Sequence, residues 1–311
     1  MDETEKSMKA VADTAVLVAA IRARESARDD HLFTDPFAQR LAGETGAQML
    51  ARMVAEVGDQ STTQIVVRTR FWDEALLRAT AALNQVVIVA AGLDARAYRL
   101  AWPAGTTLFE LDQPHVMAAK AELLTADEPR CRRVALGVDL AEDWPDALRS
   151  AGFDPGAPSV WLIEGLLQYL EEAAVRKLFT RIDALAVPGS VLLYDVVGAA
   201  LLNAPFMAGL RKSMAEQGSP WLFATDAPGE LAERLGWSAT VTDVADSGHR
   251  WGRWPTPAAS ADVPDAPRGY FVEAHKTPPG AVAHRPDARR EHRSRGLSAV
   301  LAGSLHTGWP R

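Results

Sequence analysis

The sequence contains a single cysteine, Cys131, among its 311 residues. One cysteine excludes an intramolecular disulfide and any metal site built from several cysteines. The seven histidines are scattered rather than spaced as ligands, so no metal site is expected. No GxSxG segment is present, which removes the usual serine hydrolase interpretation.

The chain also lacks an excess of positive charge. Its formal net charge is −7, so there is no general basic field to hold DNA or RNA. No apolar run approaches the roughly twenty residues that cross a bilayer, and the first residues, MDETEKSMKA, lack the apolar core of a signal peptide. We therefore expect a cytoplasmic protein that acts on a small molecule or peptide, without nucleic-acid or membrane partners. The sequence leaves its oligomeric state open.

Hydrophobic residues make up 48% of the chain, which is enough for a large core. Helical patterns alternate with short apolar strands, as is typical of a Rossmann-like, doubly wound, mostly parallel α/β sheet. The main expected helices are Thr14–Arg28, Pro36–Val57, Gln64–Ala82 and Glu171–Leu185. The expected strands are Val86–Ala90, Thr106–Leu111, Arg133–Gly137, Ser159–Ile163, Ser190–Val197, Ser238–Val244 and Gly269–Ala274.

These elements predict one domain over residues 1–276. Its first 82 residues form a helical cap, and the apolar insertion 198–234 forms a helical lid over the carboxyl edge of the sheet, where such folds bind ligands. Residues 246–268, between the last two strands, are expected to form a loop. Residues 277–311 are basic, rich in proline and poor in apolar groups, which predicts a flexible tail.

The most informative segment is 85–120. An apolar strand, VVIVA, leads into the turn AGLDAR, and a second strand delivers Glu110 and Asp112 about twenty residues after the turn. A carboxylate at this place suits two neighbouring ribose hydroxyls, because it can accept both hydrogen bonds. The turn has one glycine, Gly92 after Ala91, whereas a pyrophosphate needs several. S-adenosylmethionine has a ribose but no phosphate, so the segment predicts a methyltransferase, with a nicotinamide-dependent oxidoreductase as the alternative.

Several further motifs follow in a fixed order. AAGLDARAYRL and FELDQP are followed by VDL at Val138–Leu140 and by WLIEGLLQYL at Trp161–Leu170. Together these motifs resemble the leucine carboxyl methyltransferase family, most closely its actinobacterial branch of S-adenosylmethionine-dependent O-methyltransferases. The resemblance extends from Thr14 to Lys276 and implies a class I methyltransferase fold.

The resemblance also implies positions for the cofactor. Arg68 stands where the family has its carboxylate-binding arginine, whose planar fork suits both carboxylate oxygens. Matching the segment Asp35–Ala38 puts Arg24 where the family has a basic cofactor contact. Of the two acidic residues on the second strand, the resemblance favours Asp112 over Glu110 for the ribose.

Two later strands add the remaining expected contacts. Asp139 and the backbone of Leu140 follow the third strand, where this fold is expected to bind the adenine, and the resemblance implies that Glu164 contacts the methionine part of the cofactor. Gly165 lets the backbone turn beside the ligand. The full set of expected cofactor-binding residues is Arg24, Arg68, Ala91, Gly92, Asp112, Gln113, Asp139, Leu140, Glu164 and Gly165.

Some of these residues also have purely structural interpretations. Asp139 can cap a helix, and Asp94 and Arg96 in the turn can hold the loop closed through an internal ion pair. Arg22 is an alternative to Arg24 on the first helix.

The expected activity is O-methylation, with a carboxylate as acceptor and natural-product tailoring as the setting. A carboxylate is ionised at pH 7, so the reaction needs no general base, and the sequence identifies no catalytic residue. A phenol or alcohol acceptor would need a base, for which His249 and Asp195 are the first candidates. A non-catalytic protein that binds S-adenosylmethionine is the remaining alternative.

Overall fold

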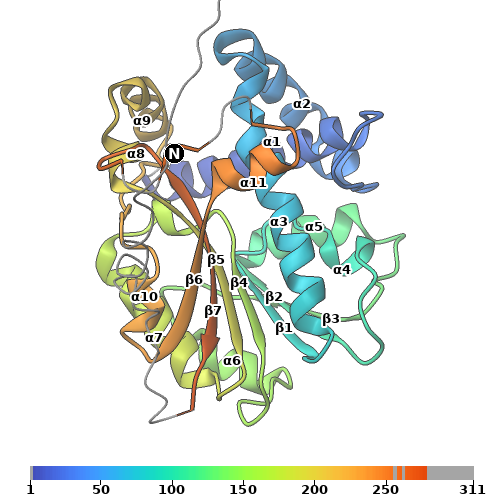
Figure 1. The fold of residues 1–311 in the computed structure, drawn as a ribbon. Coiled ribbons are helices and arrows are strands. Elements are labelled where there is room, and N and C mark those ends of the chain that lie inside the picture. Colours follow the sequence, from blue (N-terminus) through green and yellow to red (C-terminus); the bar gives the residue numbers. More distant parts are fainter. Residues whose placement is uncertain (1–2, 255–257, 261–262, 279–311) are drawn as a thin grey trace, which may run out of the picture. The chain divides into compact units, whose positions relative to one another are not determined.

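The computed structural model describes residues 3–254, 258–260 and 263–278. Within these residues, seven strands form one sheet in the order β3-β2-β1-β4-β5-β7-β6 (Figure 1). The strands from β3 to β5 in this order are parallel, and β7 runs antiparallel to both β5 and β6. The strands are β1 (Gln85–Val89), β2 (Thr107–Asp112), β3 (Arg132–Gly137), β4 (Val160–Ile163), β5 (Val191–Val197), β6 (Trp237–Asp243) and β7 (Gly269–Lys276). The predicted doubly wound, mostly parallel sheet is confirmed.

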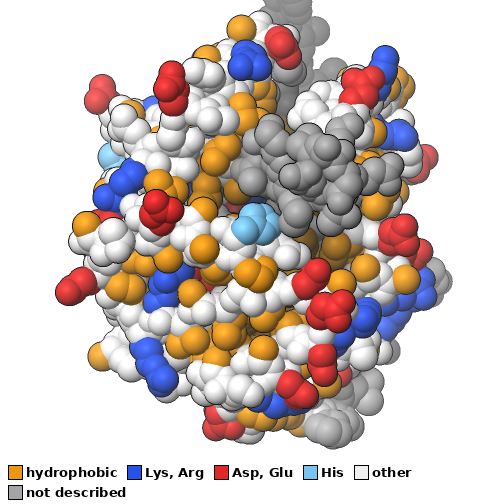
Figure 2. All heavy atoms as spheres, turned by 180° about the vertical axis from the view of Figure 1, so that it is seen from behind, with side chains coloured by type: hydrophobic (Ala, Val, Ile, Leu, Met, Phe, Trp, Pro, Cys, Tyr) orange, Lys and Arg blue, Asp and Glu red, His pale blue; other side chains and the backbone are white. Residues whose placement is uncertain are grey.

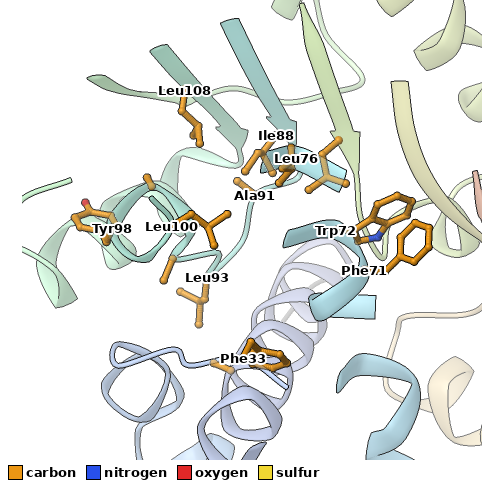
Figure 3. Close-up of a cluster of buried hydrophobic side chains, with 14 of the residues drawn as sticks. Phe33, Phe71, Trp72, Leu76, Ile88, Ala91, Leu93, Tyr98, Leu100 and Leu108 are labelled. Carbon is orange, nitrogen blue, oxygen red and sulfur yellow. The ribbon is translucent and has the colours of Figure 1, made fainter. Parts of the chain in front are cut away.

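Alternating side chains of the central strands pack into two separate hydrophobic cores, one on each face of the sheet. In β1, Val86 and Ile88 belong to one core, and Val87 and Val89 belong to the other. The first core includes side chains of α3 (Thr63–Thr80), α4 (Arg96–Arg99) and α5 (Pro114–Leu123), and Figure 3 shows part of it around Trp72. The second core includes side chains of α6 (Trp144–Ser150), α7 (Glu172–Leu185) and α10 (Glu230–Glu233). Helices therefore cover both faces of the sheet.

The N-terminal helices lie over the carboxyl end of β1. Helices α1 (Glu3–Ser26) and α2 (Ala38–Val57) pack against each other, and the short η1 (Asp59–Thr62) leads into α3. Helix α1 reaches the turn after β1, because the Nη2 atom of Arg22 donates a hydrogen bond of 2.7 Å to the carbonyl of Leu93. Helix α2 has a kink at Gly43, whose φ is +58°.

The insertion after β5 contains α8 (Ala199–Asn203), η3 (Pro205–Met207) and α9 (Ala208–Glu216). The segment 219–225, which we call the strap, then returns to the sheet. Its Leu222 N–H donates to the carbonyl of Gln168, 2.6 Å away, and its Thr225 N–H donates to that of Val197, 3.0 Å away. Gln168 belongs to η2 (Leu167–Tyr169), directly after β4. The strap therefore passes the carboxyl ends of β4 and β5.

Residues 246–268 are not simply a loop, so this part of the sequence prediction was wrong. The helix α11 (Val244–Arg250) follows β6 directly, and the carboxylate of Asp243 caps it by accepting from the N–H of Ala245 at 2.8 Å. The helix has only seven residues, which is too short to show apolar periodicity in the sequence.

Of the predicted tail, only Thr277 and Pro278 are among the described residues.

No helix in the described part of the chain combines the length and the apolar character needed to span a membrane. On the face seen in Figure 2, Lys and Arg side chains are interspersed with Asp and Glu side chains.

Candidate functional site

The turn after β1 has an unusual backbone. Ala90 and Gly92 have positive φ angles of +55° and +46°, which alanine rarely adopts. Two hydrogen bonds fix the turn: the N–H of Ala91 donates to the carbonyl of Leu111 at 3.0 Å, and the N–H of Asp94 donates to that of Ala91 at 2.8 Å. Strain of this kind is often found at functional sites.

Asp112, at the end of β2, lies directly beside this turn. One carboxylate oxygen accepts from the N–H of Gly92 at 2.6 Å, and the other accepts from the N–H of Gln113 at 2.7 Å. Burial raises the pKa of Asp112, although both hydrogen bonds oppose that rise. Each oxygen keeps a further lone pair, so the carboxylate is held in place and can accept two more hydrogen bonds.

Glu110 lies on the same strand but has different partners. It is fully buried, and one oxygen contacts both the Nζ atom of Lys120 at 2.9 Å and the Nη2 atom of Arg133 at 2.7 Å. Glu110 is therefore already paired with two cationic side chains. This supports Asp112, rather than Glu110, as the hydrogen-bond acceptor for a ligand.

Arg68 projects from α3 to the carboxyl ends of β4 and β5. Its Nε donates to Glu164 at 2.9 Å, and its Nη1 lies 3.5 Å from a carboxylate oxygen of Asp195. Its side chain is 9% exposed. Arg70, by contrast, pairs with Glu74 nearer the surface. The two arginines therefore lie on different sides of the helix.

Gly165 borders the guanidinium of Arg68. Its φ is +64°, and a Cβ atom there would lie 2.9 Å from the Nη1 atom of Arg68. Its N–H donates to Asp195 at 2.8 Å. Any side chain at this position would therefore displace the arginine.

We expect Gly165→Ala to destabilise the protein more than Gly105→Ala does. Gly105 also has a positive φ, +85°, but a Cβ there meets nothing within 4 Å. Both variants carry the backbone strain of about 1–2 kcal/mol, and the collision adds roughly 1–3 kcal/mol at Gly165 alone. Equal losses in the free energy of unfolding, measured in urea, would show that Arg68 moves aside without cost.

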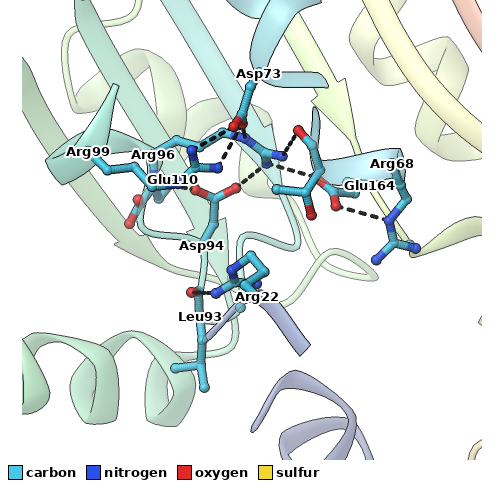
Figure 4. A network of polar contacts seen from close by, with 12 residues as sticks. Arg22, Arg68, Asp73, Leu93, Asp94, Arg96, Arg99, Glu110 and Glu164 are labelled. Atoms are coloured by element: carbon cyan, nitrogen blue, oxygen red, sulfur yellow. Dashed lines mark hydrogen bonds and ion pairs between the residues drawn. The ribbon is translucent and has the colours of Figure 1, made fainter. Parts of the chain in front are cut away.

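Arg96 connects this pair to the turn after β1 (Figure 4). Its Nη1 lies 2.7 Å from Glu164 and 2.5 Å from Asp94, and its Nε lies 2.7 Å from Asp73. Asp73 also receives two hydrogen bonds, of 2.6 and 2.7 Å, from Arg99. The predicted internal pair between Asp94 and Arg96 is confirmed. It is part of a larger network that joins α3, the turn and the end of β4.

The pKa values of two carboxylates in this network are shifted in opposite directions. Burial alone would raise the pKa of Asp94, but Arg96, with help from Lys120 and Arg99, lowers it to about 2. Burial raises the pKa of Asp195, and Glu164 adds to that rise while Arg68 opposes it.

With all groups ionised, the network has one more negative charge than positive. Its members are Arg68, Arg96 and Arg99 on one side and Asp73, Asp94, Glu164 and Asp195 on the other. An excess of negative charge in a buried place favours a cationic ligand.

The expected adenine contacts lie at the end of β3. The side chain of Asp139 is exposed, and one of its oxygens accepts from the N–H of Ala141 at 2.8 Å. This turn ends before α6 begins at Trp144, so Asp139 caps a turn rather than the helix. The carbonyl of Leu140 accepts from Arg181 at 3.0 Å.

The two arginines of α1 differ in their surroundings. Arg22 is buried and pairs with Asp35 at 2.9 Å, beneath the turn. Arg24 forms a more exposed pair with Asp59 at 2.8 Å and lines a cavity of about 310 Å³ between α1 and α2. Of the ten expected cofactor residues, only Arg24 lines this cavity. The structure therefore brings Arg22, but not Arg24, to the turn.

The sequence prediction missed Asp73 and Arg99, which complete the network. Both have other charged residues nearby, Arg70 and Glu74 for Asp73 and Arg96 for Arg99, so the sequence alone does not single them out. Among the described residues, no group of three or more His, Cys, Asp or Glu side chains is arranged to hold a metal ion.

Comparisons with known proteins identify the family. The model of the leucine carboxyl methyltransferase family matches residues 15–183. A protein of Mycobacteroides abscessus named "Putative S-adenosyl-L-methionine-dependent methyltransferase" is 40% identical over 289 residues, which cover 84% of this chain and 92% of that protein. A protein of the same name from Mycobacterium marinum is 38% identical over 311 aligned positions, which cover 88% of this chain and 98% of that protein.

Solved structures support the fold. A crystal structure titled as a methyltransferase of Thermobifida fusca matches with a TM-score of 0.58 at 15% identity, covering 85% of this chain and 94% of that one. A protein of Streptomyces avermitilis matches with a TM-score of 0.56 at 16% identity, covering 83% and 96%. The resemblance drawn from the sequence is confirmed: the chain belongs to the leucine carboxyl methyltransferase family and is an S-adenosylmethionine-dependent methyltransferase.

Proposed function

We propose that this enzyme methylates a carboxylate oxygen of a small molecule or peptide, of the kind that bacterial tailoring enzymes modify. Bound S-adenosylmethionine supplies the methyl group, whose bond to sulfur breaks as the acceptor oxygen bonds to carbon, leaving S-adenosylhomocysteine and a methyl ester. An ionised carboxylate brings no proton to remove. The chain's own task is therefore to bind, orient and exclude water.

The residues beside the turn fit this cofactor. Asp112 has lone pairs for two ribose hydroxyls and is held in place by Gly92 and Gln113. The Nη atoms of Arg68 are the donors left for a carboxylate, because Nε is bonded to Glu164 and the 3.5 Å contact with Asp195 is long for a hydrogen bond. The excess negative charge suits a sulfonium, and it disfavours the pyrophosphate of a nicotinamide dinucleotide.

One observation carries the choice of a carboxylate acceptor: neither residue suggested as a general base is both enclosed in the site and unengaged. Asp195 is 5% exposed and is engaged by Gly165 and Arg68. His249 is exposed on α11. An acceptor that arrives already ionised needs neither of them, which supports a carboxylate over a phenol or alcohol.

Calorimetry against S-adenosylmethionine and NAD tests the cofactor site. We expect S-adenosylmethionine to bind and NAD to show no saturable heat. A turnover assay on a panel of carboxylic acids and matched alcohols, read by release of S-adenosylhomocysteine, tests the acceptor. Methylation of the acids alone supports the proposal. Methylation of the alcohols alone contradicts the acceptor, and binding without turnover on any panel member favours a non-catalytic binding protein.

Asp112→Ala is expected to weaken cofactor binding. The loss of hydrogen bonds to a charged acceptor costs about 1.5–3 kcal/mol, which is roughly ten- to a hundredfold in Kd. Calorimetry with S-adenosylhomocysteine measures this loss, and the exposed Asp146→Ala serves as control. Unchanged affinity in a folded Asp112→Ala protein would remove this residue from the site.

A further inference from the structure

Three polar side-chain atoms near the proposed site lack a hydrogen-bond partner within the described chain. They are Oε1 of Gln168, Oγ of Ser219 and Nε1 of Trp221, and all three atoms are buried. Gln168 and Ser219 are only 6% and 5% exposed. A buried polar atom without a partner is unfavourable, so its presence in a native protein calls for an explanation such as an absent ligand.

Gln168 and the strap, which carries Ser219 and Trp221, lie together at the carboxyl edge of the sheet. The amide nitrogen of Gln168 donates to the carbonyl of Gly165 at 3.2 Å, which ties its side chain to the loop after Glu164. The backbone carbonyl of Gln168 accepts from the N–H of Leu222, next to Trp221. The strap is thus fastened beside the residues that we assign to the amino-acid end of the cofactor.

Two other tryptophans, Trp72 and Trp144, also have an unpaired indole nitrogen. They differ in location, because they are 0% and 1% exposed and lie inside the two apolar cores. Trp221 is half-buried on a connecting segment at the ligand-binding edge. Its unpaired N–H therefore differs from those of the two core tryptophans in lying on the segment that passes this edge.

We propose that Gln168, Ser219 and Trp221 bind the polar head of the methyl acceptor, and that this acceptor is a hydroxy acid with an apolar body. Ser219 and Trp221 supply two donors, which match the two oxygens of a carboxylate. The Oε1 atom of Gln168 accepts from a hydroxyl beside that carboxylate. Phe206 and Leu222, which are 68% and 51% exposed on the same insertion, offer apolar surface for the body.

This inference rests on the proposed function, but part of its test needs no ligand. If the atoms have no structural partner, removing them leaves the melting temperature of the free protein unchanged or higher. Trp221→Phe and Ser219→Ala should show this behaviour. The matched controls are Trp237→Phe, which loses a 2.8 Å bond to Asp183, and Ser190→Ala, which loses a 3.0 Å bond from the N–H of Ser159. Both controls should melt a few degrees lower.

The second part of the test measures the binding of two carboxylic acids to the protein loaded with S-adenosylhomocysteine. The probes are mandelate and phenylacetate, which differ by one hydroxyl, titrated by calorimetry. Wild type should bind mandelate about tenfold more tightly. Trp221→Phe and Ser219→Ala should weaken both acids about tenfold, whereas Gln168→Met should weaken mandelate alone. All three variants should still bind S-adenosylhomocysteine.

Equal loss of melting temperature in strap variants and controls would overturn the proposal, because the three atoms would then have structural partners. So would a wild type that binds neither acid or binds both alike. If either result occurs while S-adenosylhomocysteine still binds, the proposed function survives and this inference fails. Failure of S-adenosylhomocysteine to bind wild type would overturn both.

Discussion

Replacement of Arg96 by leucine is expected to lower the free energy of unfolding by about 3–5 kcal/mol, because it leaves buried carboxylates without their cation. Arg96 is 2% exposed and contacts Asp73, Asp94 and Glu164. In the variant, Asp73 still has its ion pair with Arg99, and Glu164 still has its ion pair with Arg68. Asp94 is therefore the carboxylate that loses the most stabilisation. Urea denaturation at pH 7 measures the loss.

The pH dependence of the same variant identifies the cause. In the wild type the pKa of Asp94 is about 2, below its ordinary 3.8. The stabilisation from this shift is complete above the ordinary value and is lost as the pH falls through about 2. Without Arg96 this contribution disappears, so the stability gap between variant and wild type should narrow as the pH falls below about 4.

Arg176→Leu is the control for Arg96→Leu, since Arg176 forms an ion pair with Glu172 in which both side chains are 63% exposed. Exposed pairs of this type contribute about 0–1 kcal/mol. If Arg96→Leu costs no more than Arg176→Leu, the buried network does not stabilise the fold. A gap that stays constant down to pH 3 would instead mean that lost packing, and not charge, explains the effect.

The sheet was predictable from the sequence because apolar strands and helical patterns alternate with short connections. All seven strands lie within three residues of their predicted bounds. The turn after β1 was also predictable, since Gly92 and Asp112 stand at the spacing that this fold requires. Short, polar elements were not predictable, as α11 shows. Its N-terminal capping residue, Asp243, can be recognised in the sequence, but a helix of seven residues is too short for a helical spacing of apolar residues to stand out.

The partners of the buried charges were harder to predict. The sequence shows Glu164 as an isolated charge in an apolar segment. It does not show that Arg96, 68 residues earlier in the chain, bridges Glu164 to Asp94. Pairing of this kind depends on how helices pack on the sheet. Arg24 illustrates the same limit, because two positions on α1 separate it from the buried Arg22. Its contact with the cofactor stays a prediction.

Arg68 provides the sharpest test of the chemistry of the site. If its Nη atoms bind the cofactor carboxylate, Arg68→Lys keeps the charge but loses the two-pronged geometry, so affinity for S-adenosylmethionine should fall moderately. Arg68→Ala should lose about 3 kcal/mol of binding free energy, which is more than a hundredfold in Kd. Thermal melting of each variant confirms that it is folded before calorimetry.

Decarboxylated S-adenosylmethionine separates a direct contact from a general disturbance of the site. The wild type should bind this analogue far more weakly than the parent, because the analogue lacks the group that Arg68 holds. Arg68→Ala should bind both ligands with similar, low affinity, since residue and ligand group together form a double-mutant cycle. If the variant only lost the contacts of Arg68 with Glu164 and Asp195, its affinity for both ligands would fall equally, and its preference for S-adenosylmethionine over the analogue would remain. If the variant discriminates between the ligands as strongly as wild type does, Arg68 is not the anchor, and the carboxylate is bound by Arg24 or Arg22.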